Sequence, residues 1–119
     1  MGDYRRLRIY HRARALSIRI HFLAARLPFR EQIRRGDQIV RAANSIRNNI
    51  VEGSSGSEAE FASSLRHSIK SADEVHDQLQ DLADVGLLEV RDADLLGEPR
   101  QLAAMITAFR QKLLRSRGR

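Results

Sequence analysis

Apolar residues recur along the chain at the spacing of α-helices, and no stretch alternates in the manner of a half-buried strand. Near the N-terminus they follow one another at steps of three and four residues, as the buried stripe of a helix requires. These positions are Ile9, Ala13, Leu16, Ile20, Leu23 and Leu27. Pro28 comes next, and proline ends a helix because it has no amide hydrogen to donate. The pattern predicts a first helix over about residues 4–26.

A second stripe predicts a helix over about residues 30–52, in which a separate first turn precedes Gly36. Its inward positions are Ile39, Ala43, Ile46 and Ile50. The sequence Gly-Ser-Ser-Gly at residues 53–56 has the composition of a loop, so the second helix should end there.

A third helix is expected over about residues 58–85, because Ser57 and Glu60 have the spacing of a capping box. Gly86 suits the left-handed residue that commonly follows a helix. The inward positions of this helix are Phe61, Leu65, Ser68, Ala72, Val75, Leu79 and Leu82.

A fourth stripe predicts a helix over about residues 92–114, with its first turns broken or kinked by Gly97 and Pro99. Its inward positions are Leu95, Leu102, Ile106, Phe109 and Leu113. Residues 115–119 form a basic tail that should fray. Four amphipathic helices joined by short loops predict one all-α domain over residues 1–119, an antiparallel up-down four-helix bundle.

Charge is divided along the chain into three blocks. Residues 1–47 carry a net charge of +9, residues 48–98 carry −9 and residues 99–119 carry +6. This division has two interpretations. Either the basic blocks face an anionic partner, or they pair with the acidic block inside the bundle or between subunits.

Several classes of protein are not supported by the sequence. The chain has no cysteine, so disulfide frameworks and cysteine-based zinc sites are excluded. No apolar run approaches the ~20 residues that span a bilayer, and the first residues do not resemble a signal peptide, so we expect no membrane contact and a cytoplasmic location. Glu52 has no accompanying nucleophile, oxyanion donor or metal ligand. We therefore expect no enzyme activity, no metal and no cofactor.

One row of arginines on the first helix is spaced by seven residues and borders the core: Arg5, Arg12, Arg19 and Arg26. These side chains could contact phosphates in a row. Alternatively they could form ion pairs between helices or subunits, with an acidic row on the third helix. That row consists of Asp73, Asp77, Asp81 and Asp84. Carboxylates on one helix supply too few converging oxygens for a divalent-cation site.

Other basic residues lie in the second helical stretch and near the C-terminus, where no acidic row accompanies them. We expect them to be exposed and unpaired, to form a continuous positive patch in an oligomer, and to contact RNA. These candidates are Arg30, Arg34, Arg35, Arg110, Lys112, Arg115, Arg117 and Arg119. Aromatic residues are scarce, which argues against base stacking as the main mode of binding.

Residues 38–53 read Gln-Ile-Val-Arg-Ala-Ala-Asn-Ser-Ile-Arg-Asn-Asn-Ile-Val-Glu-Gly, and this segment resembles the signature of the four-helix-bundle family of 23S rRNA intervening-sequence proteins. The resemblance extends over about residues 4–115. Arg47 stands where the family usually has proline, and Val40 where it usually has a basic residue. We interpret the motif as structural, with Asn49 and Glu52 fastening the helix end to the loop backbone. Its positions are Gln38, Arg41, Ser45, Asn49, Glu52 and Gly53.

The resemblance implies a four-helix bundle that assembles into a ring-like homopentamer. It also suggests a relationship to accessory proteins of diversity-generating retroelements, which bind reverse transcriptase and its RNA. We therefore expect a non-enzymatic oligomeric protein that binds RNA or a nucleoprotein through arginine-rich surfaces. The alternative is an oligomeric scaffold that binds a partner protein, such as a reverse transcriptase, without touching RNA.

Overall fold

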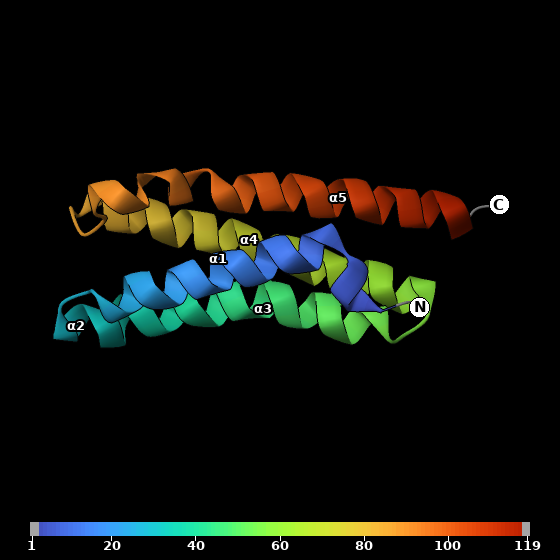
Figure 1. Cartoon of the computed structure of the whole chain (residues 1–119), viewed down its shortest axis with the longest axis horizontal. Coiled ribbons are helices and arrows are strands. Elements are labelled where there is room, and N and C mark those ends of the chain that lie inside the picture. Colours follow the sequence, from blue (N-terminus) through green and yellow to red (C-terminus); the bar gives the residue numbers. More distant parts are fainter. Residues whose placement is uncertain (1–2, 118–119) are drawn as a thin grey trace.

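The structure, a computed structural model, describes residues 3–117, with side chains up to residue 116. Four long helices make up most of this part of the chain, which contains no strand (Figure 1). They are α1 (Arg8–Ala25), α3 (Asp37–Ser54), α4 (Glu58–Asp84) and α5 (Glu98–Arg117). The prediction of an all-α protein with four main helices is confirmed.

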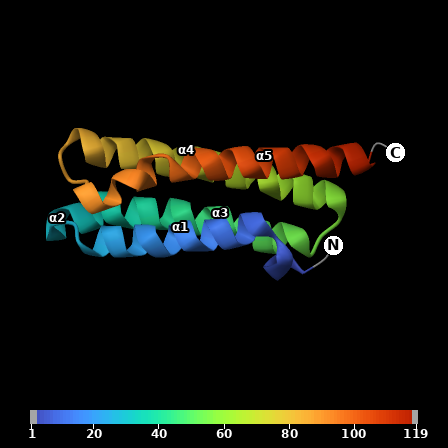
Figure 2. The same ribbon diagram turned by 45° about the horizontal axis from the view of Figure 1, so that its top comes forward.

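The long helices form an elongated bundle that measures 51 × 20 × 20 Å. Helices α4 and α5 lie side by side in one layer, and α1 and α3 lie side by side in the other, in both views (Figures 1 and 2). The short helix α2 (Phe29–Glu31) and the connection from α4 to α5 are at one end of the bundle. The chain enters and leaves at the other end. Each layer therefore presents one long outer face.

Short helical segments precede three of the long helices. A 3-10 turn, η1 (Tyr4–Arg6), precedes α1, and α2 passes through a π-helical segment, η2 (Gln32–Gly36), directly into α3. The chain reverses direction between α1 and α2, where the side-chain amide of Gln32 donates to the carbonyl oxygens of Ala25 and Leu27 at 3.1 and 2.8 Å. These bonds satisfy carbonyls that a helix end leaves without partners.

The last helix differs from its predicted extent of 92–114. Residues Val90–Leu96 form a 3-10 segment, η3, and α5 begins only at Glu98, after Gly97. Pro99 then occupies the first turn of α5, where a missing amide hydrogen costs nothing. The separate η3 segment turns across the bundle and places acidic side chains beside α1.

The core lies where the four apolar stripes meet. Every inward position expected from the sequence is buried except Phe109, which is half-buried and meets the fully buried Phe61 edge to face at 5.6 Å between ring centroids. Burial of these stripes supplies the main driving force for folding.

Helix α4 is closed at both ends by local hydrogen bonds. The Ser57 hydroxyl accepts from the Glu60 amide at 3.1 Å, and the Glu60 carboxylate accepts from the Ser57 amide at 3.0 Å, so the predicted capping box is confirmed. At the other end Gly86 has φ of 76°, and the Leu87 amide donates to the Leu82 carbonyl at 2.8 Å. This arrangement is a Schellman motif, which needs a residue that tolerates positive φ.

Candidate nucleic-acid interface

Three arginines of the heptad row, Arg12, Arg19 and Arg26, lie along α1 and its end and face carboxylates from η3 and the start of α5, whereas Arg5 lies in η1. Arg12 Nη2 donates to Glu98 Oε2 at 2.7 Å. Arg19 forms a bidentate pair with Asp94 at 2.5 and 2.8 Å. These hydrogen bonds lower the pKa of Asp94 and raise that of Arg19. Both arginines are therefore neutralised within the chain.

The most enclosed pair of the row joins Arg26 to Asp92, whose residue surface is only 6% exposed. Glu89 approaches the same guanidinium at 3.8 Å. At the other end of the row Arg5 is exposed and pairs with Asp3 at 2.9 Å.

The expectation that this row forms ion pairs with the acidic row of α4 was wrong within one chain. No ion pair in the described structure joins the row to the acidic residues of α4, namely Asp73, Asp77, Asp81 and Asp84. The reason is geometric, because α1 packs on α3 and α5, whereas α4 lies diagonally across the bundle. The acidic row of α4 remains on the outer surface.

Basic residues near the turn into α3 are only partly free. Arg30 and Arg34 are exposed and have no carboxylate partner in the described structure. Arg35 is half-buried, and its Nε donates to Glu31 Oε2 at 2.8 Å. The expectation that Arg35 is unpaired was therefore wrong, because a carboxylate four residues earlier on a helix lies within its reach.

The basic residues of α5 also divide into two kinds. Lys112 and Arg115 are exposed and unpaired among the described residues. Arg110 is half-buried, and its Nε donates to the Ala62 carbonyl on α4 at 2.8 Å, so it was wrongly expected to be free. The side chains of Arg117 and Arg119 lie outside the described part of the chain.

The two groups of candidates do not form one patch in a single copy. Arg30 and Arg34 lie at the α2 end of the bundle, whereas Lys112 and Arg115 lie near the end where the chain terminates (Figure 1). With a long axis of 51 Å, the bundle keeps them apart.

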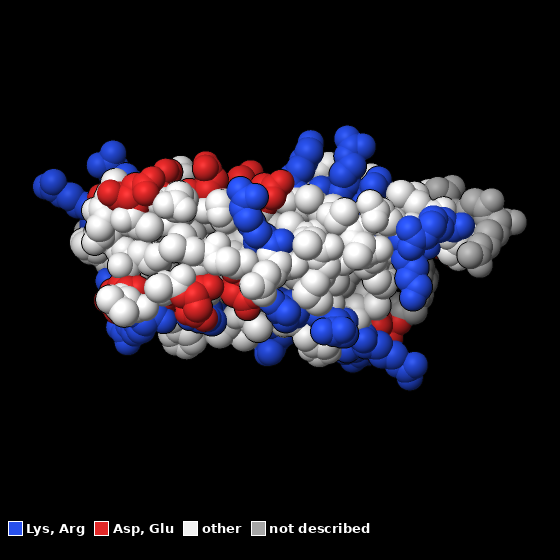
Figure 3. Space-filling model, turned by 90° about the horizontal axis from the view of Figure 1, so that it is seen from above, with Lys and Arg blue, Asp and Glu red and all other residues white. Residues whose placement is uncertain are grey.

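A basic surface that the sequence had not suggested appears at the C-terminal end of the α4–α5 layer. Arg66 and Lys70 on α4 are exposed, and the bond from Arg110 to Ala62 places this part of α4 beside the second half of α5. Figure 3 shows acidic side chains mainly over the other half of the molecule, and basic side chains along the edges of this half. We call it the C-terminal basic surface. It comprises Arg66, Lys70, Arg110, Lys112 and Arg115.

Arg66 and Lys70 were missed because they belong to a block of sequence with a net charge of −9. The signal that could have found them is the antiparallel pairing of the last two predicted helices. That pairing brings the start of one helix beside the end of the other.

The motif on α3 joins this helix to α4. The Ser71 hydroxyl donates to the Ser45 hydroxyl at 2.9 Å, and the Asn49 amide donates to both oxygens of Ser45 at 2.9 and 3.2 Å. Asn49 thus bonds one turn back in its own helix and does not hold the loop backbone, contrary to expectation. The Glu52 carboxylate is exposed and makes no hydrogen bond in the described structure.

Polar residues of the motif also line a hollow of about 430 Å³ on the outer side of the α3–α4 seam. Gln38 and Arg41 face Glu74 and Gln78 across it. The Gln78 Oε1 atom is buried without a hydrogen-bond partner. The hydroxyls of Ser45 and Ser71, which bond to each other, also line this hollow, so its groups can bind polar ligands.

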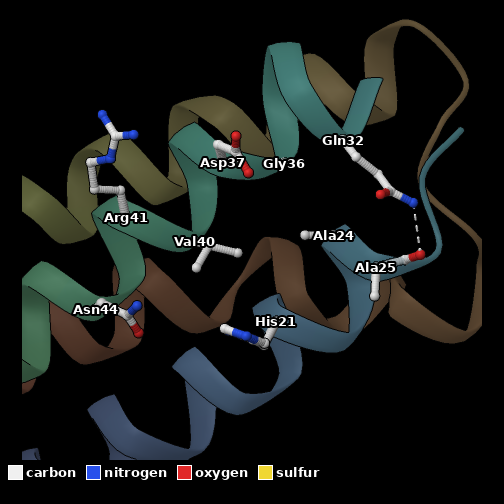
Figure 4. A pocket seen from close by; sticks show the side chains of 9 residues that line it. All are labelled: His21, Ala24, Ala25, Gln32, Gly36, Asp37, Val40, Arg41 and Asn44. Atoms are coloured by element: carbon white, nitrogen blue, oxygen red, sulfur yellow. Dashed lines mark hydrogen bonds between the residues drawn. The ribbon is translucent and has the colours of Figure 1, made fainter. Parts of the chain in front are cut away.

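A second hollow of about 430 Å³ lies between α1, η2 and α3 (Figure 4). His21 and Val40 line it from facing helices, and the small residues Ala24 and Gly36 form its narrow end. It continues into a hollow of about 390 Å³ beside Phe22, whose surface is 65% exposed. This face carries exposed apolar side chains, Ile18 and Phe22, among polar ones such as His21 and Asn44, and so differs from the C-terminal basic surface.

Two further features bear on function. Among the described residues, no group of three or more histidine, aspartate or glutamate side chains is placed to hold a metal ion. Within the same residues, no helix has the length and apolar character needed to cross a membrane.

Comparison with known proteins agrees with the motif on α3. No curated protein matches the chain significantly. The family model described as 23S rRNA-intervening sequence protein matches residues 5–108, which include all of α1, α3 and α4 and the first half of α5. A match over most of the chain, together with the helical bundle, shows that the chain belongs to the 23S rRNA-intervening sequence protein family.

Proposed function

We propose that this protein is a non-enzymatic RNA-binding or nucleoprotein-binding factor that contacts phosphates through the C-terminal basic surface. One observation carries the proposal. The arginines of α1 that border the core are paired with Asp94, Glu98 and Asp92, whereas Lys112 and Arg115 have no carboxylate partner in the described structure. The chain therefore neutralises one basic row and leaves another exposed.

Unpaired surface arginines and lysines bind nucleic acid mainly by releasing counterions from phosphates. Arg66 and Lys70 extend the exposed charge from α5 onto α4, which suits a backbone that passes over both helices. Phe109, the aromatic residue on this part of α5, is half-buried against Phe61 and is not free to stack on a base. Binding should accordingly depend on charge and show little preference for sequence.

The functional unit we propose is a closed ring of identical copies. Family resemblance suggests five copies. Each copy is a bundle whose helices alternate in direction. The segregation of charged and apolar outer faces supports assembly. We place the protein in the cytoplasm.

The competing function is a scaffold that binds a partner protein, such as a reverse transcriptase, without direct contact to RNA. The apolar outer face of the α1–α3 layer favours it. Ile18 and Phe22 are 40% and 65% exposed there, and nucleic-acid backbones do not cover such side chains.

The two functions are separated by mass-resolved sizing of the purified protein with and without bulk RNA, at two or more salt concentrations. A phosphate-binding protein should co-elute with RNA at low salt and dissociate steeply as salt rises. If the protein elutes free of RNA at about 50 mM salt, the proposed RNA binding is wrong and the scaffold function is favoured.

A further inference from the structure

The hollow on the outer side of the α3–α4 seam is lined by polar side chains that have no partner in the protein. We call this hollow of about 430 Å³ the seam pocket. Four of its side chains make no hydrogen bond or ion pair in the described structure, although they face one another. They are Gln38, Arg41, Glu74 and Gln78. Polar groups that converge without pairing are available to a ligand.

The two helices set the length of the pocket and the order of its groups. Ser45 lies at one end, and Gln38, seven residues earlier on α3, lies at the other. With a rise of 1.5 Å per residue, about 10 Å separates them. Because α4 runs opposite to α3 here, Gln78 lies across from Gln38, and Glu74 lies across from the helical turn that carries Arg41. Arg41 and Glu74 have opposite charges yet form no ion pair, so room remains between them.

The α4 side of the pocket presents hydrogen-bond acceptors. The Gln78 Oε1 atom is buried and has no hydrogen-bond partner in the described structure. A buried acceptor without a donor is costly, so a ligand should supply an N–H group to it. The Glu74 carboxylate, one turn earlier on the same helix, is a second acceptor. This side therefore favours a ligand with adjacent N–H donors.

The α3 side has the opposite character. The Arg41 guanidinium can only donate hydrogen bonds. The Ser45 hydroxyl accepts from the Ser71 hydroxyl and from the Asn49 amide, which leaves its own hydrogen free to donate. Ala42 is buried between these residues and contributes an apolar surface. This side therefore favours a ligand with acceptor atoms.

We propose that the seam pocket binds one unpaired guanine base of an RNA. Guanine carries two adjacent donors, N1–H and the N2 amino group, beside the acceptors O6 and N7, whereas adenine, cytosine and uracil lack adjacent donors. Arg41 donates to O6 and N7, which is the commonest specific contact to guanine. Glu74 and Gln78 accept from N1–H and the N2 amino group. This inference rests on the proposed binding of RNA and adds recognition of one base to it.

The position of the pocket favours a base within an RNA strand. Lys70, an exposed member of the C-terminal basic surface, directly precedes Ser71 in α4. A nucleotide whose phosphate contacts Lys70 can therefore place a neighbouring base in the pocket. The C-terminal basic surface by itself responds to charge, so a preference for one base should come from the pocket.

The test compares labelled oligouridylates that differ in one central nucleotide and therefore carry equal charge. That nucleotide is guanosine, adenosine or inosine, and inosine is guanosine without the N2 amino group. Fluorescence anisotropy at one salt concentration should show that the parent binds the guanosine oligomer about 5- to 100-fold more tightly than the adenosine oligomer. The inosine oligomer should bind with intermediate affinity, because one donor to the α4 side is missing.

Glu74→Gln tests the pocket itself, because it replaces one acceptor oxygen with a donor. It should remove most of the preference for guanosine over adenosine. Asp73→Asn is the matched control, since it makes the same change of charge at an exposed neighbour that does not line the pocket. Both variants lose a negative charge and should bind every oligomer more tightly, but only Glu74→Gln should change the ratio of affinities. Circular dichroism should show parental helix content in both.

The remaining outcomes separate this inference from the proposed function. If no oligomer binds at about 50 mM salt, the proposed RNA binding is wrong, and the guanine site fails with it. If all oligomers bind equally, RNA binding is supported and the guanine site is wrong. A preference for guanosine that survives Glu74→Gln, or that Asp73→Asn removes to the same extent, would also overturn the assignment to the seam pocket.

Discussion

Gly53 on α3 lies directly against Ser64 on α4. A Cβ atom on Gly53 would stand 2.6 Å from the Ser64 Cβ and 2.9 Å from Phe61 Cδ1. The replacement Gly53→Ala should therefore force the helices apart and lower the free energy of unfolding by about 1–3 kcal/mol. It should do so although alanine is the better helix former. Urea unfolding followed by circular dichroism measures the change.

Gly97→Ala is the matched control. The nearest atom to a Cβ there is Gln101 Nε2 at 3.9 Å, an ordinary contact, and the backbone φ is −87°. The added methyl group should change the free energy of unfolding by less than about 1 kcal/mol. Equal losses from both substitutions would show that the approach of α3 to Ser64 is not the cause.

The pair between Arg26 and Asp92 offers a second prediction. Asp92 is buried, so Arg26→Leu leaves a carboxylate without its main partner in a poorly solvated position. The free energy of unfolding should fall by about 2 kcal/mol, and the double variant Arg26→Leu with Asp92→Leu should regain much of it. Thermal and urea unfolding of both variants provide the measurement.

Arg5→Leu serves as the comparison for this pair. Arg5 bonds to Asp3 with both side chains largely in solvent, at 71% and 40% exposure. Exposed ion pairs contribute little, so this substitution should shift stability by less than about 1 kcal/mol. A loss as large as that of Arg26→Leu would contradict the role we give to burial.

Much of the fold could be predicted from the apolar stripes because a helix buries the residues that share one of its faces. The sequence placed Ile20, Ile46 and Leu79 in the core, and all are fully buried. Residues 90–96 were harder, because 3-10 and α-helical segments share short-range spacing. The break at Gly97 was expected from the sequence and is confirmed, whereas the 3-10 form of residues 90–96 was not expected.

The partners of the α1 arginines could not be predicted for a different reason. Two acidic segments were available, and only the one from Asp73 to Asp84 forms a row along one face of a helix. Which segment lies beside α1 depends on the order in which the helices pack, and the stripes do not encode that order. The ion pair between Arg35 and Glu31 could have been predicted from the sequence, because residues four apart on a helix are neighbours.

The pair between Arg19 and Asp94 should make stability depend on pH in the acidic range. Hydrogen bonds from Arg19 hold the pKa of Asp94 below its usual value of 3.8. The contribution is therefore complete above about pH 3.8 and is lost as pH falls through the lower folded-state pKa. Asp94→Asn should melt below the parent at about pH 7, and the difference should shrink below about pH 3.8.

Melting temperatures of parent and variant from about pH 7 to about pH 2 provide the test. Glu52→Gln is the control, because its carboxylate is exposed and makes no hydrogen bond in the described structure. That variant should melt close to the parent at each pH. If the melting temperatures of the parent and Asp94→Asn differed by the same amount at every pH, the pH dependence would not arise from Asp94.

The last prediction separates binding of RNA from stability. Lys112→Glu with Arg115→Glu changes two exposed side chains that have no partner in the described structure, so the melting temperature should stay within a few degrees of the parent. If these residues bind phosphates, affinity for bulk RNA should fall, and the slope of log K against log salt should flatten by about 0.7–0.9 for each phosphate that is no longer neutralised. Fluorescence anisotropy with labelled RNA at several salt concentrations gives both quantities.

Arg12→Glu with Arg19→Glu makes the same change of charge at residues that are paired. The new carboxylates would face Glu98 and Asp94, so repulsion between like charges should lower the melting temperature before any effect on RNA appears. The two double variants thus carry equal net charge and differ only in whether the basic side chains they replace are neutralised in the folded chain. If both weaken RNA binding equally while remaining folded, binding follows net charge alone, and the C-terminal basic surface has no special role.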